Sequence, residues 1–333
     1  MNIDEIKASI KEQYGIDVTE CIKIKNIYRL KSNHGEYCLK LIKYQYPHFY
    51  FILSAILHLQ KQGFNKVPEI IDTVKGEKYV KLGDLHAYLT PWVISRESNY
   101  DNPIDLMRAA EKLSELHVCS EGFTLTNEMR PRIGWFTWTN VFSTRIDEIM
   151  DFKKRIGQKA VKSEFDRLYL SLIEEEVRRA VASIENLKDS NYVEIMEKEV
   201  LKRGFCHHDY AHHNVLVEAS SDISIIDFDY CILDTHLHDL SSLMIRAMKD
   251  GKWEMEKADF IIKSYEANKK VLPEEIAIMA AFIEFPQQFW QIGLQYYWEQ
   301  QPWGEEFFIK KLNKYSEDRR ERQEFVDDLR IYL

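Results

Sequence analysis

Three oxygen-bearing side chains, Asp209, Asn214 and Asp227, have the types and the spacing that phosphoryl transfer to a hydroxyl group requires. This reaction needs a carboxylate that orients the hydroxyl and accepts its proton, and it needs oxygen ligands that hold magnesium against the nucleotide phosphates. Asp209 and Asn214 lie five positions apart in the segment Cys206-His-His-Asp-Tyr-Ala-His-His-Asn-Val-Leu-Val, and Asp227 follows in Ile225-Ile-Asp-Phe-Asp. The series therefore predicts a nucleotide- and metal-dependent transfer site.

The segments around these residues are predicted to form a loop followed by a hairpin. Asn214 to Val217 and Ile223 to Phe228 are short apolar runs, separated by the polar tract Glu218 to Asp222. An Asp in the loop can face a substrate, an Asn at the start of the strand points toward a metal, and Asp227 closes the other side. The order H-x-D-x-x-x-x-N, hairpin, D-F matches the catalytic loop and metal-binding Asp of protein kinases.

Two other interpretations of the same residues are open. In the first, the loop histidines are exposed and Asp227 caps a turn. In the second, the pairs His208-Asp209 and His238-Asp239 bind a transition metal in a phosphohydrolase. Such sites usually take their ligands from helices, whereas the first pair leads directly into the predicted strand at Val215, so we favour transfer to a hydroxyl. The histidines of the loop are His207, His208, His212 and His213.

The N-terminal part of the chain has the pattern of a small antiparallel sheet with helices. Apolar residues alternate with polar ones from Cys21 to Lys43 around a turn at Ser32 to Gly35, which places Lys40 on the second arm of a hairpin. Helical spacing predicts helices over 3–14 and from Phe49 to Gln62. Further strands are predicted over Val67 to Thr73, Lys78 to Leu82 and His86 to Val93.

The rest of the chain is predicted to be mostly helical. With 333 residues the chain is longer than one hydrophobic core usually supports, so two lobes are expected. The fold class is therefore α+β, with an N-terminal nucleotide-binding lobe over residues 1–93 and a C-terminal catalytic and substrate lobe over residues 94–333. The predicted helices of the second lobe cover Asp105 to His117, Trp138 to Ile156, Ser163 to Leu187 and Asn191 to Lys198, and resume at Asp239.

Composition excludes several classes of protein. A net charge of -9 argues against a general nucleic-acid binder, and no apolar stretch reaches the roughly 20 residues of a membrane helix. The N-terminus does not resemble a signal peptide, so synthesis in the cytoplasm is expected. The five cysteines form no C-x-x-C pair, which favours reduced thiols over disulfides or a zinc site.

The chain resembles the superfamily of aminoglycoside phosphotransferases and choline kinases, and within it the CotS family of spore-coat-associated proteins. This resemblance implies a bilobal protein-kinase-like fold, ATP and Mg²⁺ as cofactors, a small-molecule substrate, a place in the spore coat, and other coat proteins as partners. The residues that carry it are Leu39-Lys-Leu-Ile, Leu59 to Pro68, Leu113 to Phe123, His207 to Asn214, Ile226-Asp-Phe-Asp-Tyr-Cys, Asp234 and Asp239-Leu.

The resemblance also implies a role for each matching residue. Asp209 is expected to be the catalytic base, Asn214 and Asp227 the magnesium ligands, and Lys40 the lysine that binds phosphate. His207 and Asp239 are expected to brace the catalytic loop. The alternative for Lys40 is an ordinary solvent-exposed lysine on a strand, and the alternative for Asp239 is an ordinary helix N-cap. The residues expected to contact the nucleotide are Tyr28, Pro91, Trp92 and Val93.

The acceptor pocket is less well defined by the sequence. The C-terminal region combines aromatic rings with carboxylates, which suits a cationic group such as an amine. The alternative is that these rings pack the core, as most helical aromatics do. The candidate acceptor residues are Asp229, Glu284, Trp290 and Tyr296.

Two departures from the kinase pattern support a different hypothesis. The turn around Lys25 to Tyr28 lacks the glycines that normally let backbone N–H groups approach a triphosphate. The helix after Lys40 contains no carboxylate between Tyr46 and Gln62 that could pair with that lysine. The chain is therefore either a kinase that transfers the ATP γ-phosphate to an alcohol or a catalytically weak or inactive structural relative in the spore coat.

Overall fold

The computed structural model describes residues 2–331, and the chain divides into two compact units. The first unit combines residues 1–132 with residues 203–233, and the second combines residues 133–202 with residues 234–333. The segment with Asp209, Asn214 and Asp227 therefore packs with the N-terminal part of the chain. The lobe boundary expected at Val93 stays a prediction.

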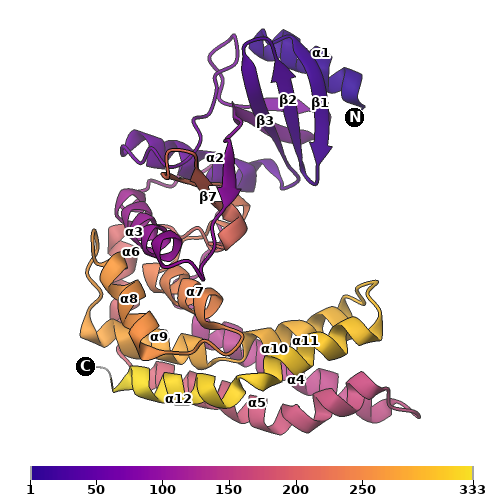
Figure 1. The fold of residues 1–333 in the computed structure, drawn as a ribbon, viewed down its shortest axis with the longest axis vertical. Helices are drawn as coiled ribbons and strands as arrows, with labels where there is room; N and C mark the ends of the chain where they lie inside the picture. The colour runs from indigo at the N-terminus through magenta and orange to yellow at the C-terminus, as the bar shows by residue number, and fades with distance from the viewer. Residues whose placement is uncertain (1, 332–333) are drawn as a thin grey trace. The chain divides into compact units, whose positions relative to one another are not determined.

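The first unit is built on an antiparallel sheet of order β1-β2-β3-β5-β4, whose strands are shown in indigo and purple in Figure 1. Helix α1 (Ile3–Tyr14) buries Ile6 and Ile10 against the sheet, with Leu30 and Leu39 in the same core. The helix and hairpin predicted here are confirmed, and Lys40 lies on β3 as expected. The strands are β1 (Val18–Ile24), β2 (Ile27–Ser32), β3 (Gly35–Ile42), β4 (Val80–Leu82) and β5 (Leu85–Pro91).

The strand predicted over Val67 to Thr73 is wrong. This segment runs as irregular backbone and makes one sheet-like bond, from the Ile71 N–H to the Leu89 carbonyl at 2.9 Å. Pro68 has no N–H to donate, which disfavours a paired strand. A strand that the sequence did not predict, β6 (Ser95–Glu97), pairs instead with the hairpin of β7 (Val215–Glu218) and β8 (Ile223–Ile225).

Two helices complete the first unit, and both were predicted. Helix α2 (Tyr46–Lys61) starts three residues before the predicted start and is followed by Gly63 at φ 85°, a conformation that glycine adopts readily. Helix α3 (Pro103–Ser120) begins with Asn102, whose side chain accepts the Ile104 N–H at 2.9 Å. The predicted hairpin after Asn214 is also confirmed.

The second unit is helical throughout its regular structure among residues 133–202 and 234–331. Its core is rich in rings, with Phe152, Phe165, Tyr169 and Phe289 all fully buried. Helix α7 begins at His236, three residues before the predicted start, because Thr235 accepts the Leu237 N–H as N-cap. The α-helices are α4 (Trp138–Gln158), α5 (Glu164–Asp189), α6 (Tyr192–Lys202), α7 (His236–Met248), α8 (Met255–Tyr265), α9 (Pro273–Glu284), α10 (Gln287–Gly293), α11 (Glu305–Glu317) and α12 (Arg319–Arg330), and a π-helix (Leu294–Trp298) follows α10.

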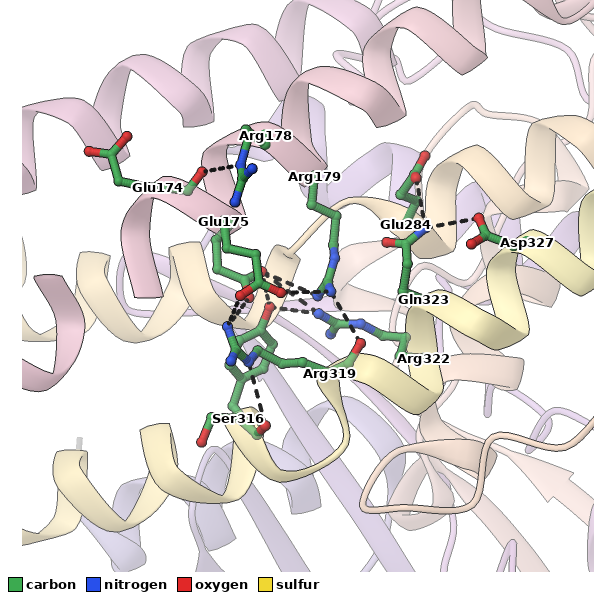
Figure 2. Close-up of polar contacts among 12 residues, drawn as sticks. Glu174, Glu175, Arg178, Arg179, Glu284, Ser316, Arg319, Arg322, Gln323 and Asp327 are labelled. Atoms are coloured by element: carbon green, nitrogen blue, oxygen red, sulfur yellow. Dashed lines mark hydrogen bonds and ion pairs between the residues drawn. The ribbon is translucent and has the colours of Figure 1, made fainter. Parts of the chain in front are cut away.

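A buried charge network ties the C-terminal helices to α5. Figure 2 shows Arg179, Arg319 and Arg322 converging from α5 and α12 on the carboxylates of α5. The Glu176 side chain at the centre is fully buried and accepts the Tyr315 hydroxyl of α11 at 2.5 Å. Helices distant in sequence are therefore joined by charge as well as by apolar packing.

Candidate active site

His207 links the two segments that carry the catalytic pattern. The ring is fully buried, and its Nδ1 accepts the backbone N–H of Asp209 at 3.3 Å. Its Nε2 must then carry the proton, which it donates to the carbonyl of Ile226 at 2.9 Å. One imidazole thereby links the backbone of Asp209 to the residue before Asp227, and the bracing role expected for His207 stays a prediction.

Asn214 is oriented by Asp209. Its Nδ2 donates to the Asp209 backbone carbonyl at 2.9 Å and to Asp209 Oδ2 at 3.1 Å. Since both partners are acceptors, the amide nitrogen must face Asp209, and the amide oxygen is turned away from it. The backbone carbonyl of Asn214 also accepts the Ile226 N–H at 3.0 Å. These bonds hold the amide beside the segment that ends in Asp227.

Asp227 adopts the left-handed backbone conformation, with φ 69°. This conformation is uncommon for residues other than glycine, and it is maintained only where surrounding contacts require it. His208 in the catalytic loop is also left-handed, at φ 68°. His208 directly precedes the predicted catalytic base Asp209, and Asp227 is itself a predicted metal ligand. Strained backbone conformations of this kind are commonly found at functional sites.

Lys40 and Asp227 form a close ion pair. The Lys40 Nζ lies 2.5 Å from Asp227 Oδ1 and 2.8 Å from Asp229 Oδ1, and the lysine side chain is only 7% exposed. Burial alone would lower the pKa of Lys40, but Tyr88 and the two carboxylates raise it above its usual value. Burial would raise the pKa of Asp227, but the neighbouring Lys40 charge holds it below its ordinary range. Lys40 and Asp227 are therefore both charged.

A cavity of about 720 Å³ opens beside this pair within the first unit. Lys40, Asn214 and Asp227 line it, so the predicted phosphate and metal residues are brought together. Three of the residues expected to contact the nucleotide, Pro91, Trp92 and Val93, also line the cavity.

Tyr28 is the exception among the expected nucleotide contacts. Among the described residues, it belongs to the core between the sheet and α1, and its neighbour Ile27 faces the cavity instead. Successive strand residues point to opposite faces of a sheet, so Ile27 and Tyr28 cannot both face the cavity.

The glycine-free turn covers part of the same cavity. Ile24 pairs with Ile27 across β1 and β2, so Lys25 and Asn26 form a two-residue turn. Lys25 takes φ 53°, the left-handed conformation that a glycine would normally supply at such a turn. All four residues line the cavity. The hairpin therefore covers part of the cavity, with a lysine at the position where a glycine would be expected.

The donor set in the cavity fits a hard divalent cation. Magnesium prefers carboxylate and amide oxygens and is usually held by one or two protein groups together with phosphates and water. Asp227 supplies a charged carboxylate and Asn214 an amide oxygen directed away from Asp209. Neither sulfur nor imidazole is in this pair. The alternative of a transition-metal phosphohydrolase concerns other residues, His208-Asp209 and His238-Asp239, and this pair does not test it.

The family model described as "Spore coat putative kinase YutH" matches residues 7–329. The chain belongs to this spore coat kinase family. Spore coat protein S of Bacillus subtilis (strain 168) is 22% identical over 308 residues, which cover 92% of this chain and 87% of that protein. The predicted membership of a spore-coat-associated, kinase-like family is confirmed, while the narrower CotS assignment stays a prediction.

Solved structures similar to this member of the spore coat kinase family show its fold. An aminoglycoside phosphotransferase from Alicyclobacillus acidocaldarius gives a TM-score of 0.84 at 22% identity, over 99% of this chain and 96% of that chain. Spectinomycin phosphotransferase in complex with ADP and spectinomycin gives a TM-score of 0.65 at 15% identity, over 100% and 98% of the two chains. The predicted α+β, protein-kinase-like fold is confirmed.

Apart from Asp229, the remaining predicted site residues of this family member lie in the second unit. Asp239 is in the first turn of α7 and fully buried, and Thr235 rather than Asp239 caps that helix. This excludes the N-cap alternative for Asp239, and its bracing role stays a prediction.

The candidate acceptor residues of the second unit make contacts typical of packing. Glu284 is buried and pairs with Arg330, and Tyr296 packs on Phe165 at a ring separation of 4.1 Å. Trp290 lies under the Arg145 guanidinium, 4.4 Å from the ring centre. These contacts favour the core alternative for all three side chains.

Sequence reasoning missed two features of the site in this family member. Asp229, expected near the acceptor, instead contacts Lys40. Arg29 covers the Trp92 ring at 4.7 Å and pairs with Glu36 at 2.5 Å, at the wall of the cavity. The opposed charges of Arg29 and Glu36 on a predicted hairpin could have indicated the second feature, since residues near each other across two strands interact.

Proposed function

We propose that this protein is an ATP- and magnesium-dependent phosphotransferase of the spore coat that acts on a small hydroxyl compound. The observation that carries the proposal is the convergence of Lys40, Asn214 and Asp227 on one cavity, with Asp209 bonded to Asn214. Lys40 comes from a distant part of the sequence to meet Asn214 and Asp227 there, and together with the neighbouring Asp209 these groups have the chemistry that phosphoryl transfer requires.

Each residue has a distinct part in this proposal. Asp209 orients the acceptor hydroxyl and takes up its proton, and the bonds from Asn214 and His207 fix its position. Lys40 binds the nucleotide phosphates with its ammonium group. Asn214 and Asp227 hold magnesium, which neutralises the charge that develops on the transferred phosphoryl group. The cavity walls at Pro91 to Val93 bind the base.

The place of action is proposed from the family. Its description names the spore coat, as does the name of the Bacillus subtilis relative. We therefore propose the spore coat as the location and other coat proteins as partners. Among residues 2–331, no helix combines the length and the apolar character that crossing a membrane requires.

A thermal-shift experiment with ATP and Mg²⁺ tests the proposal. A ligand that binds only the folded state raises stability by about 2.7 kcal/mol at 100 times its Kd, so a clear increase in Tm is expected. Asp227→Ala should abolish the magnesium-dependent part of the shift. Asp222→Ala removes an exposed carboxylate that pairs with Lys66 and serves as the matched control. An unchanged shift in Asp227→Ala would refute the metal role.

The second candidate function is a coat scaffold that retains the fold without catalysis. The glycine-free turn at Lys25 and Asn26 favours it, because kinases normally hold the triphosphate with backbone N–H groups there. A folded wild-type protein that shows no shift at millimolar nucleotide would support the scaffold. If the shift is present, ATP turnover with amines, sugars and amino alcohols will identify the acceptor class.

A further inference from the structure

The turn after Asp227 brings a second carboxylate to Lys40. Asp227 is followed by the 3₁₀ turn Phe228–Tyr230, which the Cys231 N–H closes by donating to the Phe228 carbonyl at 2.9 Å. Phe228 is buried and anchors the turn. As a result the Asp229 side chain lies beside Lys40, with its Oδ1 2.8 Å from the Lys40 Nζ.

Helix α2 cannot provide the carboxylate that normally positions the phosphate-binding lysine of a kinase. In protein kinases that partner is a glutamate on the helix that follows the lysine strand. Here α2 (Tyr46–Lys61) contains neither aspartate nor glutamate. Lys40 is nevertheless almost fully buried, and a buried ammonium without a fixed counter-charge is costly.

Asp227 cannot serve as the permanent partner if it binds magnesium. A cation on the Asp227 carboxylate neutralises its charge and repels the neighbouring ammonium, so the counter-charge of Lys40 must then come from another group. The two carboxylates are placed differently. Asp227 lines the cavity and is 33% exposed, whereas Asp229 is 14% exposed and does not line the cavity among the described residues.

We propose that Asp229 is a positioning residue that replaces the missing helix carboxylate and holds Lys40 toward the nucleotide phosphates when Asp227 binds the metal. The inference rests on the proposed function, since it assigns a partner within that same site. Lys40 contacts both carboxylates in this structure, and on this proposal Asp229 remains its partner when nucleotide and metal bind. The D-F-D segment thus supplies both the metal ligand and the lysine partner.

The test measures ATP affinity in the presence of Mg²⁺ by calorimetry. Asp229→Asn should weaken ATP binding by about 10- to 100-fold, the usual cost of losing a group that orients a binding residue. Asp229→Glu should restore most of the affinity, because it keeps the charge. Asp222→Asn, which removes the exposed partner of Lys66, should change ATP affinity less than about 2-fold.

The decisive comparison is made in a second background. If Asp229 acts through Lys40, Asp229→Asn should have almost no further effect on ATP affinity in a Lys40→Met protein. Equal effects in both backgrounds would overturn the proposal. A higher magnesium concentration for half-maximal ATP binding in Asp229→Asn would also overturn it, because it would make Asp229 a metal ligand.

A measurement without nucleotide separates this inference from the proposed function. The losses in Tm for Lys40→Met and Asp229→Asn should be clearly less than additive when combined, since the two groups contact each other. If wild-type protein binds no ATP but the losses are non-additive, the proposed function fails and the pairing stands. If ATP binds and the losses are additive, the pairing fails alone.

Discussion

The buried carboxylate of Glu176 offers a direct test of how charge stabilises the second unit. Its Oε2 accepts the Tyr315 hydroxyl at 2.5 Å and lies 3.5 Å from Arg179 Nη1 and 3.8 Å from Arg322 Nη2. Its Oε1 lies 3.4 Å from Arg319 Nη1. The perturbation is Glu176→Gln, which keeps the shape of the side chain and removes the charge that faces Arg179, Arg319 and Arg322.

The expected magnitude follows from what the arginines lose. Removing one partner of a buried ion pair costs about 3–5 kcal/mol, because a buried charge is left uncompensated. The cost here lies toward the lower end, about 3 kcal/mol, since Arg319 keeps Glu175 at 2.8 Å and Arg179 also donates to a backbone carbonyl at 3.1 Å. At about 2–4 °C per kcal/mol, the Tm should fall by roughly 6–12 °C.

The assay is urea denaturation followed by tryptophan fluorescence, with calorimetry for the Tm. Glu175→Gln is the matched control, because Glu175 is the adjacent residue, contacts two of the same arginines and is 48% exposed. Exposed pairs contribute about 0–1 kcal/mol, so the control should lose little. Equal losses for Glu175→Gln and Glu176→Gln would refute the reasoning that burial sets the cost.

Two further predictions concern the second unit. A Cβ at Gly134 would lie 2.3 Å from Asp234 Oδ2, so Gly134→Ala should destabilise the fold by about 1–3 kcal/mol. Gly157 at the end of α4 has open space around it, so Gly157→Ala should be neutral or stabilising. Measurements of Tm check both variants. His236 lies between Glu199 at 2.9 Å and Glu275 at 3.6 Å, and despite the lowering effect of burial these carboxylates raise its pKa above 6.5. The stabilisation that protonated His236 provides is therefore fully present below pH 6.5 and is lost as the pH rises through the raised pKa of His236. Urea titrations from pH 6 to pH 9 should show the wild type losing stability relative to His236→Gln. A constant difference over this range would contradict the assignment.

The sequence was most informative where local pattern and chemistry coincide. The helix over residues 3–14, the hairpin that carries Lys40 and the loop before Asn214 follow from periodicity and turn residues, and the structure has all three. The segment from Val67 to Thr73 has the composition of a strand but runs as irregular backbone. Whether an apolar segment pairs depends on neighbours that are distant in sequence, which propensity does not include.

The partner of Lys40 was missed for a related reason. Sequence reasoning looked for a carboxylate on the next helix, where kinases usually carry it, and found none there. The carboxylate that contacts Lys40 lies 187 to 189 positions later, in a turn whose direction depends on the left-handed backbone of Asp227. A residue series indicates which groups are present, but only the folded backbone determines which of two aspartates faces the cavity and which lies behind it.

Lys40 lies between two aspartates, so the charges of these three groups depend on one another. Asp227 is a carboxylate whose pKa lies below its ordinary range, so it carries a charge that requires a counter-ion. Lys40 supplies that charge at 2.5 Å. If a cation binds Asp227 as proposed, Asp229 at 2.8 Å still supplies a counter-charge to Lys40, and an unpaired buried charge, which would cost several kcal/mol, is avoided. The proposed exchange on Asp227 therefore depends on the second aspartate, Asp229, remaining beside Lys40.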